Sequence, residues 1–289
     1  MNIFISRPHG YCSGVIRAIN LVKKARQKHV GVPVFVLGSI VHNEDVIQEL
    51  FSLGITTVRD LKKSPAQLLK ELPDQAVVVF TAHGHEVSLD EIARQKKMVV
   101  YDATCPMVTT NHRIIQNELN NDHQVIYIGK KNHPEANAAK SLGDNVFLIE
   151  NNEDVNLLEF VDKSPLVINQ TTLSQTELAA LHTSIISKFS KARIADEICN
   201  ATRLRQQAVL ALPKETELVY VIGGVNSSNT ASLADMARKT LPQTRVIRIL
   251  NADEINKKDL DGLNYVAVVS GASTPLETTN RVVEELKRR

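Results

Sequence analysis

The sequence lacks tryptophan and is poor in aromatic residues, which make up 4% of its 289 residues. Because 43% of the residues are nevertheless hydrophobic, the core must be built mainly from aliphatic side chains, as in many α/β proteins. Low-complexity linkers are also absent. A chain of this length is long enough for two or three domains of ordinary size.

Neither charge is in surplus, since 34 basic residues face 32 acidic ones and the formal net charge is +2. This balance gives no electrostatic footprint for nucleic acid. No window approaches the roughly 18 consecutive apolar residues of a membrane helix, and residues 1–10 contain only a brief apolar run interrupted by Arg7. We therefore expect a cytoplasmic protein with neither a membrane nor a nucleic acid as its partner.

Cysteine is scarce: the chain has three, an odd number that disfavours a disulfide framework. Close Cys-x2-Cys pairs, which are usual in structural zinc sites, are missing. Cys105 lies 93 residues after Cys12 and 94 before Cys199. Each cysteine follows a short apolar run and precedes a segment with helical periodicity, so each is expected at the carboxyl end of a strand. In a parallel sheet, ligands bind at that edge.

The even spacing belongs to an internal repeat. After each cysteine come a helix and a strand, and the strand ends at a glycine 26, 24 or 24 residues further on. Four residues beyond these glycines stand His42, His133 and Ser227. The predicted strands are 2–6, 34–37, 55–58, 77–80, 98–101, 125–128, 146–149, 166–168, 192–195, 219–222, 245–249 and 265–269.

Strands that alternate with helices predict parallel sheets with helices on their faces. The third repeat has no closing strand after its last helix, and residues 2–6 form the only unassigned strand. We therefore predict that the N-terminal strand completes the third sheet. The predicted lobes are residues 13–104, 105–198, and 199–289 completed by 1–12.

The recurrence of one thiol per repeat argues against chance. A lone cysteine is usually a small buried apolar residue, but an indifferent filler would not recur at every sheet edge. Three thiolates from three lobes suit a cubane iron-sulfur cluster with one iron left without a protein thiolate. An open iron can bind a substrate oxygen and deliver electrons to it.

Polar side chains end the other strands. Histidines, hydroxyls and helix N-termini at one edge would form a pocket for an anion such as a phosphate, although serine and asparagine there are also common helix caps. Walker A and Gly-x-Gly-x-x-Gly patterns are absent, so we expect a small phosphorylated compound rather than a nucleotide. Glu135, with Thr171 and Thr172 nearby in the repeat, is the candidate proton relay.

Eight motifs together resemble the 4-hydroxy-3-methylbut-2-enyl diphosphate reductase family over essentially the whole chain. They are Gly10-Tyr11-Cys12-Ser13-Gly14-Val15, Val41-His42-Asn43, Ala82-His83-Gly84, Asp102-Ala103-Thr104-Cys105-Pro106, His133-Pro134-Glu135, Gln170-Thr171-Thr172, Cys199-Asn200-Ala201-Thr202 and Asn226-Ser227-Ser228-Asn229.

The resemblance implies a trefoil of three α/β domains around a [4Fe-4S] cluster held by Cys12, Cys105 and Cys199. It implies a reductive dehydroxylation in which Glu135 supplies protons, Thr171 hydrogen-bonds near the reacting hydroxyl, and His133 serves the proton path. Electrons would come from a ferredoxin or a flavodoxin. The residues expected to hold the diphosphate of the allylic substrate are His42, His83, His133, Ser227, Ser228, Asn229 and Ser273.

Four positions depart from the family pattern. Ala136 and Ala138 stand where valine and glycine are usual, and His9 stands where arginine is frequent. Val225 replaces a residue that is often basic, which suggests one positive charge fewer at the diphosphate pocket. The alternatives to a reductase are a zinc hydrolase acting on a phosphorylated substrate, and a cluster-bearing or phosphate-binding sensor without turnover.

Overall fold

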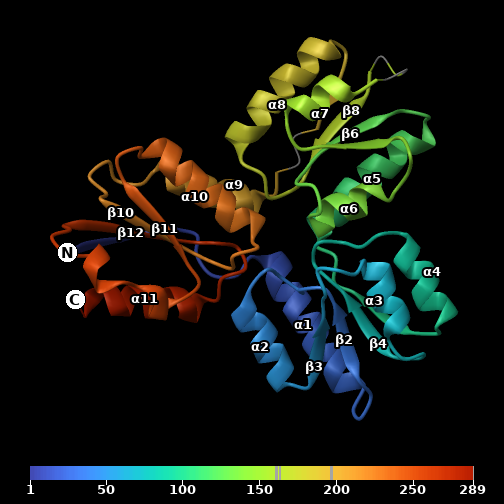
Figure 1. Cartoon of the computed structure of the whole chain (residues 1–289), viewed down its shortest axis with the longest axis horizontal. Helices are drawn as coiled ribbons and strands as arrows, with labels where there is room; N and C mark the ends of the chain where they lie inside the picture. The colour runs from blue at the N-terminus through green and yellow to red at the C-terminus, as the bar shows by residue number, and fades with distance from the viewer. Residues whose placement is uncertain (160–161, 163, 196–197, 289) are drawn as a thin grey trace. The chain divides into compact units, whose positions relative to one another are not determined.

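The computed structural model describes every residue except 160, 161, 163, 196, 197 and 289. The described residues form three parallel β-sheets of four strands each, with helices around them (Figure 1). This confirms the predicted α/β class with small parallel sheets. Within the described part of the chain, no helix has both the length and the apolar character that crossing a membrane requires.

The strands follow the predicted repeat closely. The first sheet contains β2 (Val34–Leu37), β3 (Ile55–Val58), β4 (Val77–Phe80) and β5 (Val99–Asp102). The second contains β6 (Val125–Ile128), β7 (Val146–Ile149), β8 (Leu166–Asn169) and β9 (Arg193–Ile194). The third contains β1 (Asn2–Ile5), β10 (Leu218–Ile222), β11 (Arg245–Ile249) and β12 (Tyr265–Ser270).

Helices connect the strands. The first sheet is accompanied by α1 (Ser13–Lys28), α2 (Glu44–Ser52), α3 (Pro65–Glu71) and α4 (Ser88–Gln95). The second is accompanied by α5 (Pro106–Asn120), α6 (Pro134–Lys140), α7 (Asn152–Leu157) and α8 (Gln175–Lys188). The third is accompanied by α9 (Asn200–Leu210), α10 (Ser228–Thr240), α11 (Leu276–Lys287) and the short 3-10 helices η1 (Ala252–Glu254) and η2 (Lys257–Asp259).

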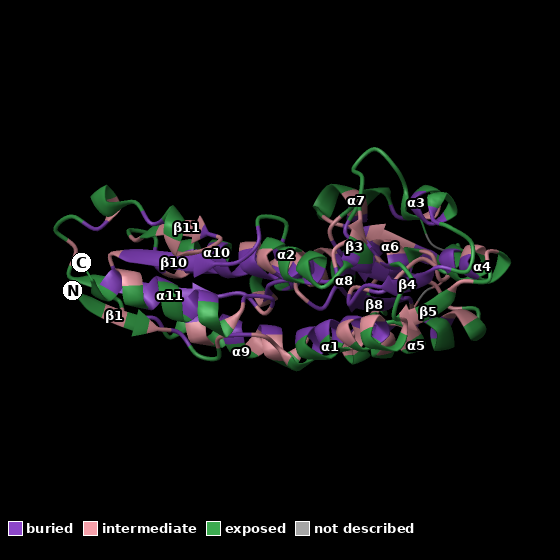
Figure 2. Ribbon diagram, turned by 90° about the horizontal axis from the view of Figure 1, so that it is seen from below, coloured by how far each residue is buried: buried purple, intermediate pink, exposed green. Residues whose placement is uncertain are grey.

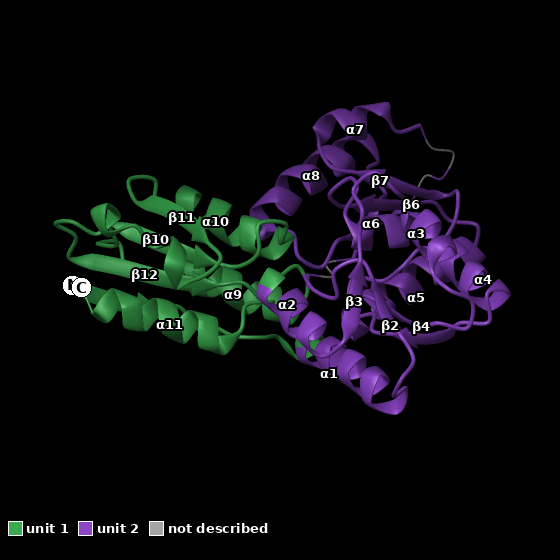
Figure 3. Cartoon of the chain, turned by 60° about the horizontal axis from the view of Figure 1, so that its bottom comes forward, with its two compact units in different colours: residues 1–15, 42–44, 199–289 green, residues 16–41, 45–198 purple. Residues whose placement is uncertain are grey.

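The chain divides into two compact units (Figure 3). Unit 1 consists of residues 1–15, 42–44 and 199–289, and unit 2 of residues 16–41 and 45–198. Cys12 and Cys199 therefore belong to unit 1, and Cys105 belongs to unit 2. The division into three lobes remains a prediction.

All three sheets share one strand order. The orders are β3-β2-β4-β5, β7-β6-β8-β9 and β11-β10-β12-β1. In the third sheet β1 takes the place that β5 and β9 take in the other two, and Asn2 pairs with Tyr265 of β12. This confirms that the N-terminal strand completes the third sheet.

The strand order decides where a site can form. In the first two sheets the chain runs from the first strand of the repeat to one edge, and from the third strand, its neighbour, to the opposite edge; in the third sheet β1 occupies that opposite edge. The carboxyl ends of the first and third strands therefore border a crevice, the usual ligand site of an open α/β sheet. The polar residues predicted for the site lie in the loops that follow these strands, which are β2 and β4, β6 and β8, and β10 and β12.

Burial on both faces explains why the central strands are continuous apolar runs (Figure 2). Successive side chains of a strand point to opposite faces. In β6, Ile126 and Ile128 therefore pack in a cluster with α8 residues such as Leu178. Val125 and Tyr127 pack on the other face with residues of α5 and α6. Each large side chain buried in this way contributes about 1.5–3 kcal/mol.

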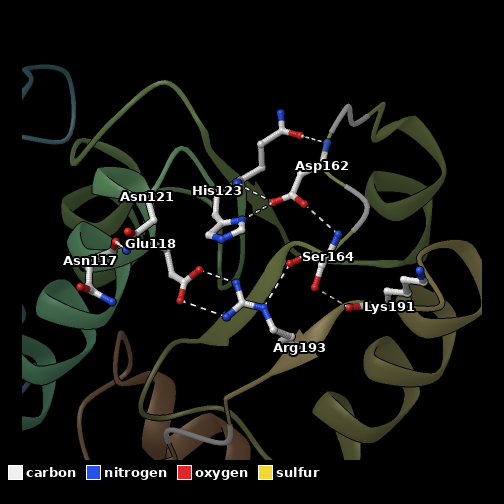
Figure 4. Close-up of polar contacts among 9 residues, drawn as sticks. Asn117, Glu118, Asn121, His123, Asp162, Ser164, Lys191 and Arg193 are labelled. Carbon is white, nitrogen blue, oxygen red and sulfur yellow. Dashed lines mark hydrogen bonds and ion pairs between the residues drawn. The ribbon is translucent and has the colours of Figure 1, made fainter.

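Polar contacts hold the edge of the second sheet (Figure 4). Arg193, at the start of the edge strand β9, forms two parallel hydrogen bonds to Glu118 of α5, one of them 3.1 Å from Nη1 to Oε1. The Glu118 side chain is only 12% exposed. Nearby, Asp162 accepts hydrogen bonds from the backbone N–H groups of Gln124 and Ser164. These contacts tie α5 to the edge of the sheet.

Removing Glu118 should destabilise the protein. The Glu118→Ala variant removes a largely buried carboxylate together with both of its hydrogen bonds to Arg193, so we expect a loss of about 1–2 kcal/mol in the free energy of unfolding. Glu91→Ala, which breaks the exposed Glu91–Arg94 pair, is the matched control and should leave the free energy of unfolding nearly unchanged. Urea unfolding measures both, and equal losses would contradict the prediction.

Candidate functional site

The three cysteines lie at corresponding places in the repeat. All three are free and half-buried. Cys105 and Cys199 stand at the N-cap positions of α5 and α9, where the helix dipole is positive. The backbone N–H of Cys105 donates to Ala82 O, and that of Cys12 donates to Ala272 O, both at 3.0 Å. Each of these two thiols is thus held beside the loop that leaves the third strand of a repeat.

A buried cation lies near two of the thiols in unit 1. The Arg205 side chain, on a residue only 3% exposed, donates from Nη2 to Gly10 O at 2.7 Å and from Nη1 to Ala201 O at 3.0 Å. Burial lowers the pKa of Arg205, while the charges of Cys12 and Cys199 act in the opposite direction. Its Nε is buried and has no hydrogen-bond partner. Such an environment suits an anionic group bound through thiolates.

In the part of the chain that the structure describes, no three histidine, cysteine, aspartate or glutamate side chains gather as a ready-made metal site. The ligand role of Cys12, Cys105 and Cys199 therefore stays a prediction.

A buried carboxyl group is the centre of the site in unit 2. Glu135, in the first turn of α6, is 2% exposed. Its Oε1 accepts a hydrogen bond of 2.7 Å from Thr171 N, and its Oε2 lies 3.1 Å from Thr171 Oγ1. Tyr127 Oη contacts Oε1 at 3.4 Å. Burial raises the pKa of Glu135 to about 7, although the bonds from Thr171 and Tyr127 act to lower it.

Two histidines lie beside this carboxyl group. His133, the N-cap residue of α6, accepts a hydrogen bond of 3.2 Å at Nδ1 from Glu135 N. Because Nδ1 is the acceptor, a neutral His133 carries its proton on Nε2. The ring of His83 meets that of His133 edge to face, with centroids 5.6 Å apart. His83 Nδ1 in turn lies 3.2 Å from Thr81 Oγ1. The loops after β4, β6 and β8 thus bring His83, His133 and Thr171 to one edge of unit 2.

The predicted anion-binding residues of unit 1 surround the start of α10. Ser227 caps this helix, and its Oγ accepts a hydrogen bond of 3.2 Å from Thr230 N. Ser228 is half-buried. Asn229 is 5% exposed, and both polar atoms of its amide are buried without a hydrogen-bond partner. Buried amides in proteins are normally paired, so Asn229 is a strong candidate for a ligand contact.

Glycines allow the strand ends to approach α10. A Cβ atom on Gly223 would lie 2.3 Å from Thr230 Oγ1, and one on Gly271 would lie 2.4 Å from the same atom. Side chains larger than hydrogen at these positions would push the start of α10 away. Gly224 similarly lets the backbone oxygen of His42 come close, at 2.3 Å from a would-be Cβ.

His42 belongs to the same unit as α10, because residues 42–44 are part of unit 1. Ser273 Oγ donates to His42 O at 3.4 Å. Burial lowers the pKa of His42 to about 4, with Glu44 opposing the shift. The imidazole is therefore neutral at physiological pH and can offer an N–H donor but not a full charge.

Sequence reasoning missed Tyr127 and Arg205. Tyr127 was hidden in an apolar strand, where its hydroxyl gave the only signal of a polar role. Arg205 lies in a helix that also carries Arg203, and periodicity alone does not show which of the two is buried.

Comparison with known proteins decides the family. A family model described as LytB protein matches residues 3–287. The chain belongs to the LytB family. This agrees with the resemblance seen in the sequence.

Curated relatives of this LytB-family chain are named 4-hydroxy-3-methylbut-2-enyl diphosphate reductase. The one from Symbiobacterium thermophilum is 39% identical, over 100% of this chain and 97% of the relative. The one from Bacillus subtilis is 36% identical, over 100% and 91%.

Solved structures agree. The E-1-hydroxy-2-methyl-but-2-enyl-4-diphosphate reductase from Plasmodium falciparum superposes with a TM-score of 0.90 at 30% identity, covering 99% of this chain and 87% of that one. A structure described as (E)-4-hydroxy-3-methyl-but-2-enyl diphosphate reductase, the terminal enzyme of the non-mevalonate pathway, gives a TM-score of 0.67 at 26% identity, with both chains fully covered.

The raised pKa of Glu135 predicts a pH-dependent stability. Between the ordinary value of 4.5 and about 7, the folded state keeps a proton that the unfolded state has lost, so stability falls as the pH rises through this range. Glu135→Gln removes this dependence. The difference in the free energy of unfolding, variant minus parent, should therefore increase by roughly 3 kcal/mol from pH 4 to pH 8.

Urea unfolding at a series of pH values, on protein free of bound metal, measures this gain. Glu153→Gln changes an exposed glutamate of the same unit and should leave the pH dependence as it is. Parallel pH curves for the parent and Glu135→Gln would show that Glu135 is not a buried neutral acid.

Proposed function

We propose that this LytB-family chain reduces 4-hydroxy-3-methylbut-2-enyl diphosphate to isopentenyl diphosphate and dimethylallyl diphosphate. The reaction consumes two electrons and two protons and releases the allylic hydroxyl as water. The observation that carries the proposal is Glu135, a fully buried carboxyl group whose pKa is raised to about 7. A proton donor works best when its pKa is near the working pH.

The donor set fits a [4Fe-4S] cluster. Three free cysteines at equivalent sheet edges are available as ligands, and the buried guanidinium of Arg205 near Cys12 and Cys199 would offset the negative charge of a thiolate-bound cluster. In the proposal Cys12, Cys105 and Cys199 hold the cluster. When bound, it would supply electrons and Lewis acidity.

Glu135 and Thr171 form the route by which a proton reaches the substrate. Protonated Glu135 can donate a hydrogen bond from Oε2 to Thr171 Oγ1. The threonine hydroxyl can in turn donate a hydrogen bond to the reacting hydroxyl of the substrate. His133 is fixed next to Glu135 by the hydrogen bond from Glu135 N to its Nδ1, so the neutral ring carries its proton on Nε2. We assign His133 to the proton path as well as to the diphosphate.

The diphosphate is held mainly by neutral donors. Asn229 offers an amide without a protein partner, and Ser227 lies at the positive N-terminus of α10. His42 is neutral, because burial lowers its pKa to about 4. The full set assigned to the diphosphate is His42, His83, His133, Ser227, Ser228, Asn229 and Ser273.

The proposal includes a cytoplasmic location and a one-electron donor of the ferredoxin or flavodoxin class. Each carrier delivers a single electron, so two encounters complete one turnover.

Replacing the proton donor should abolish turnover without loss of iron. Glu135→Gln keeps the size and hydrogen-bonding ability of the side chain but cannot release a proton, so we expect at least a hundredfold fall in kcat. The measurement is consumption of the allylic diphosphate by anaerobically purified protein with a strong one-electron reductant. Iron and sulfide analysis should give equal contents in the parent protein and the variant.

Two outcomes would count against the reductase. Colourless protein that contains zinc would favour a hydrolase, and brown protein that binds the diphosphate without turnover would favour a sensor. Full activity of Glu135→Gln would exclude Glu135 from the proton path.

Asn229 should contribute to binding of the substrate. Asn229→Ala removes the unpartnered amide, and we expect an affinity for the substrate that is weaker by about tenfold to a hundredfold, since a hydrogen bond to a charged group contributes roughly 1.5–3 kcal/mol. Calorimetric titration of the anaerobic protein measures the dissociation constant. Asn264→Ala, an exposed residue of the same unit before β12, is the control and should bind normally. Equal affinities for all three proteins would remove Asn229 from the pocket.

A further inference from the structure

Tyr127 is a buried phenol in an otherwise apolar strand. It is the third residue of β6 and is 1% exposed. Its ring packs in a cluster with Ile115 of α5, Ala136 of α6 and Ile168 of β8. A tyrosine hydroxyl in such a place costs free energy unless it finds a partner. The partner that the structure gives it is Glu135.

The three contacts of Glu135 are unequal. Oε1 faces two groups, Thr171 N at 2.7 Å and Tyr127 Oη at 3.4 Å. Oε2 faces the hydroxyl of Thr171 at 3.1 Å. Thr171 N can only donate, and a buried phenol whose pKa is raised well above its ordinary value also stays a donor. Two donors at Oε1 therefore make that oxygen the acceptor, and the proton of the neutral acid belongs on Oε2.

Small residues make room for the phenol ring. A Cβ atom on Gly129 would lie 2.9 Å from Tyr127 Cε1 and 3.1 Å from Ala136 Cβ. Gly129 directly follows β6, and Ala136 directly follows Glu135. The ring thus fills a space that exists because both neighbours are small, and its hydroxyl reaches the carboxyl group from the side of the core.

Few other titratable groups surround this carboxyl group. His133 precedes it on the same element, and its ring contacts His83 from the loop after β4. From β8 the neighbour is Thr171, which carries no charge. From α5 come the uncharged Asn111, whose amide donates to Asn169 O at the end of β8, and His112, whose ring lies beside Gly84 and whose pKa is lowered by burial.

We propose that Tyr127 is a positioning residue that fixes the proton of Glu135 on Oε2, so that the proton leaves by way of the Thr171 hydroxyl. The proposal rests on the assignment of Glu135 as the proton source. Tyr127 itself touches neither substrate nor cofactor. Without its hydroxyl, Oε1 keeps one donor instead of two, and the preference for a proton on Oε2 weakens.

Tyr127→Phe tests this with almost no change of shape. Removal of a donor to the carboxylate should raise the pKa of Glu135 further, by about one unit, because hydrogen bonds to the charged form lower it. The alkaline limb of the kcat profile should move to higher pH by the same amount. We expect kcat to fall about threefold with KM unchanged, since a weaker acid transfers its proton more slowly.

Infrared difference spectroscopy gives a readout that needs neither cluster nor substrate. The carbonyl stretch of protonated Glu135, identified by its disappearance in Glu135→Gln, should move to higher frequency in Tyr127→Phe because its Oε1 has lost a hydrogen bond. Titration of the same band gives the pKa directly. Gly129→Ala, whose added methyl displaces the ring, should shift the band in the same direction.

Tyr220→Phe is the matched control. Tyr220 is the third residue of β10, fully buried like Tyr127, but it belongs to unit 1. This variant should leave the Glu135 band and the pH profile unchanged. An unmoved band and an unchanged pKa in Tyr127→Phe would overturn the proposal and leave Tyr127 a packing residue. Absence of turnover in the parent protein would instead refute the reductase assignment, while the infrared titration would still decide the role of Tyr127.

Discussion

The burial of one carboxyl group against three donors is the interaction on which the chemistry of unit 2 depends. Desolvation of Glu135 favours the neutral acid, and the hydrogen bonds from Thr171 and Tyr127 favour the carboxylate. Burial prevails, but only in part, so the pKa settles at about 7 rather than far above it. With fewer hydrogen-bond donors, the pKa of Glu135 would be higher and the group would not release its proton at neutral pH. With more exposure to water, its pKa would be near the ordinary value and the group would be ionised at neutral pH. The balance makes Glu135 able both to keep and to release a proton.

The strand order places these groups together. Glu135 follows β6 and Thr171 follows β8, and these two strands are hydrogen-bonded neighbours in a sheet where the chain diverges between them. Any pair of polar residues just beyond the ends of two such strands faces the same crevice. The third sheet uses the same arrangement, with Ser227 after β10 and Ser273 after β12. One topological rule, repeated, thus positions both the proposed proton relay and the proposed anion-binding residues.

Much of the fold could be predicted from the sequence because its signals are local. Short apolar runs predicted strands such as 34–37 and 146–149 with their observed bounds. The position of the N-terminal strand could be predicted because the third repeat lacked its closing strand and residues 2–6 formed the only strand that belonged to no repeat. Tyr127 and Arg205 could not be found in this way. Their roles depend on partners that lie 8 and 195 residues away, Glu135 and Gly10, and on which side of an element faces inward.

The proposed anion-binding loop around Val225 has a positive charge beside it that the sequence alone does not reveal. The sequence alone suggests that Val225 leaves this loop one positive charge short. The side chain of Val225 is indeed exposed, but the guanidinium of Arg248, on the neighbouring strand β11, donates from Nη2 to Gly224 O at 3.1 Å and to Val225 O at 2.7 Å. A cation therefore does lie at this loop, held by backbone carbonyl groups rather than carried by the loop itself. Because a guanidinium fixed by two hydrogen bonds loses less conformational freedom than a flexible side chain on an exposed loop, this arrangement keeps the positive charge at a lower entropic cost.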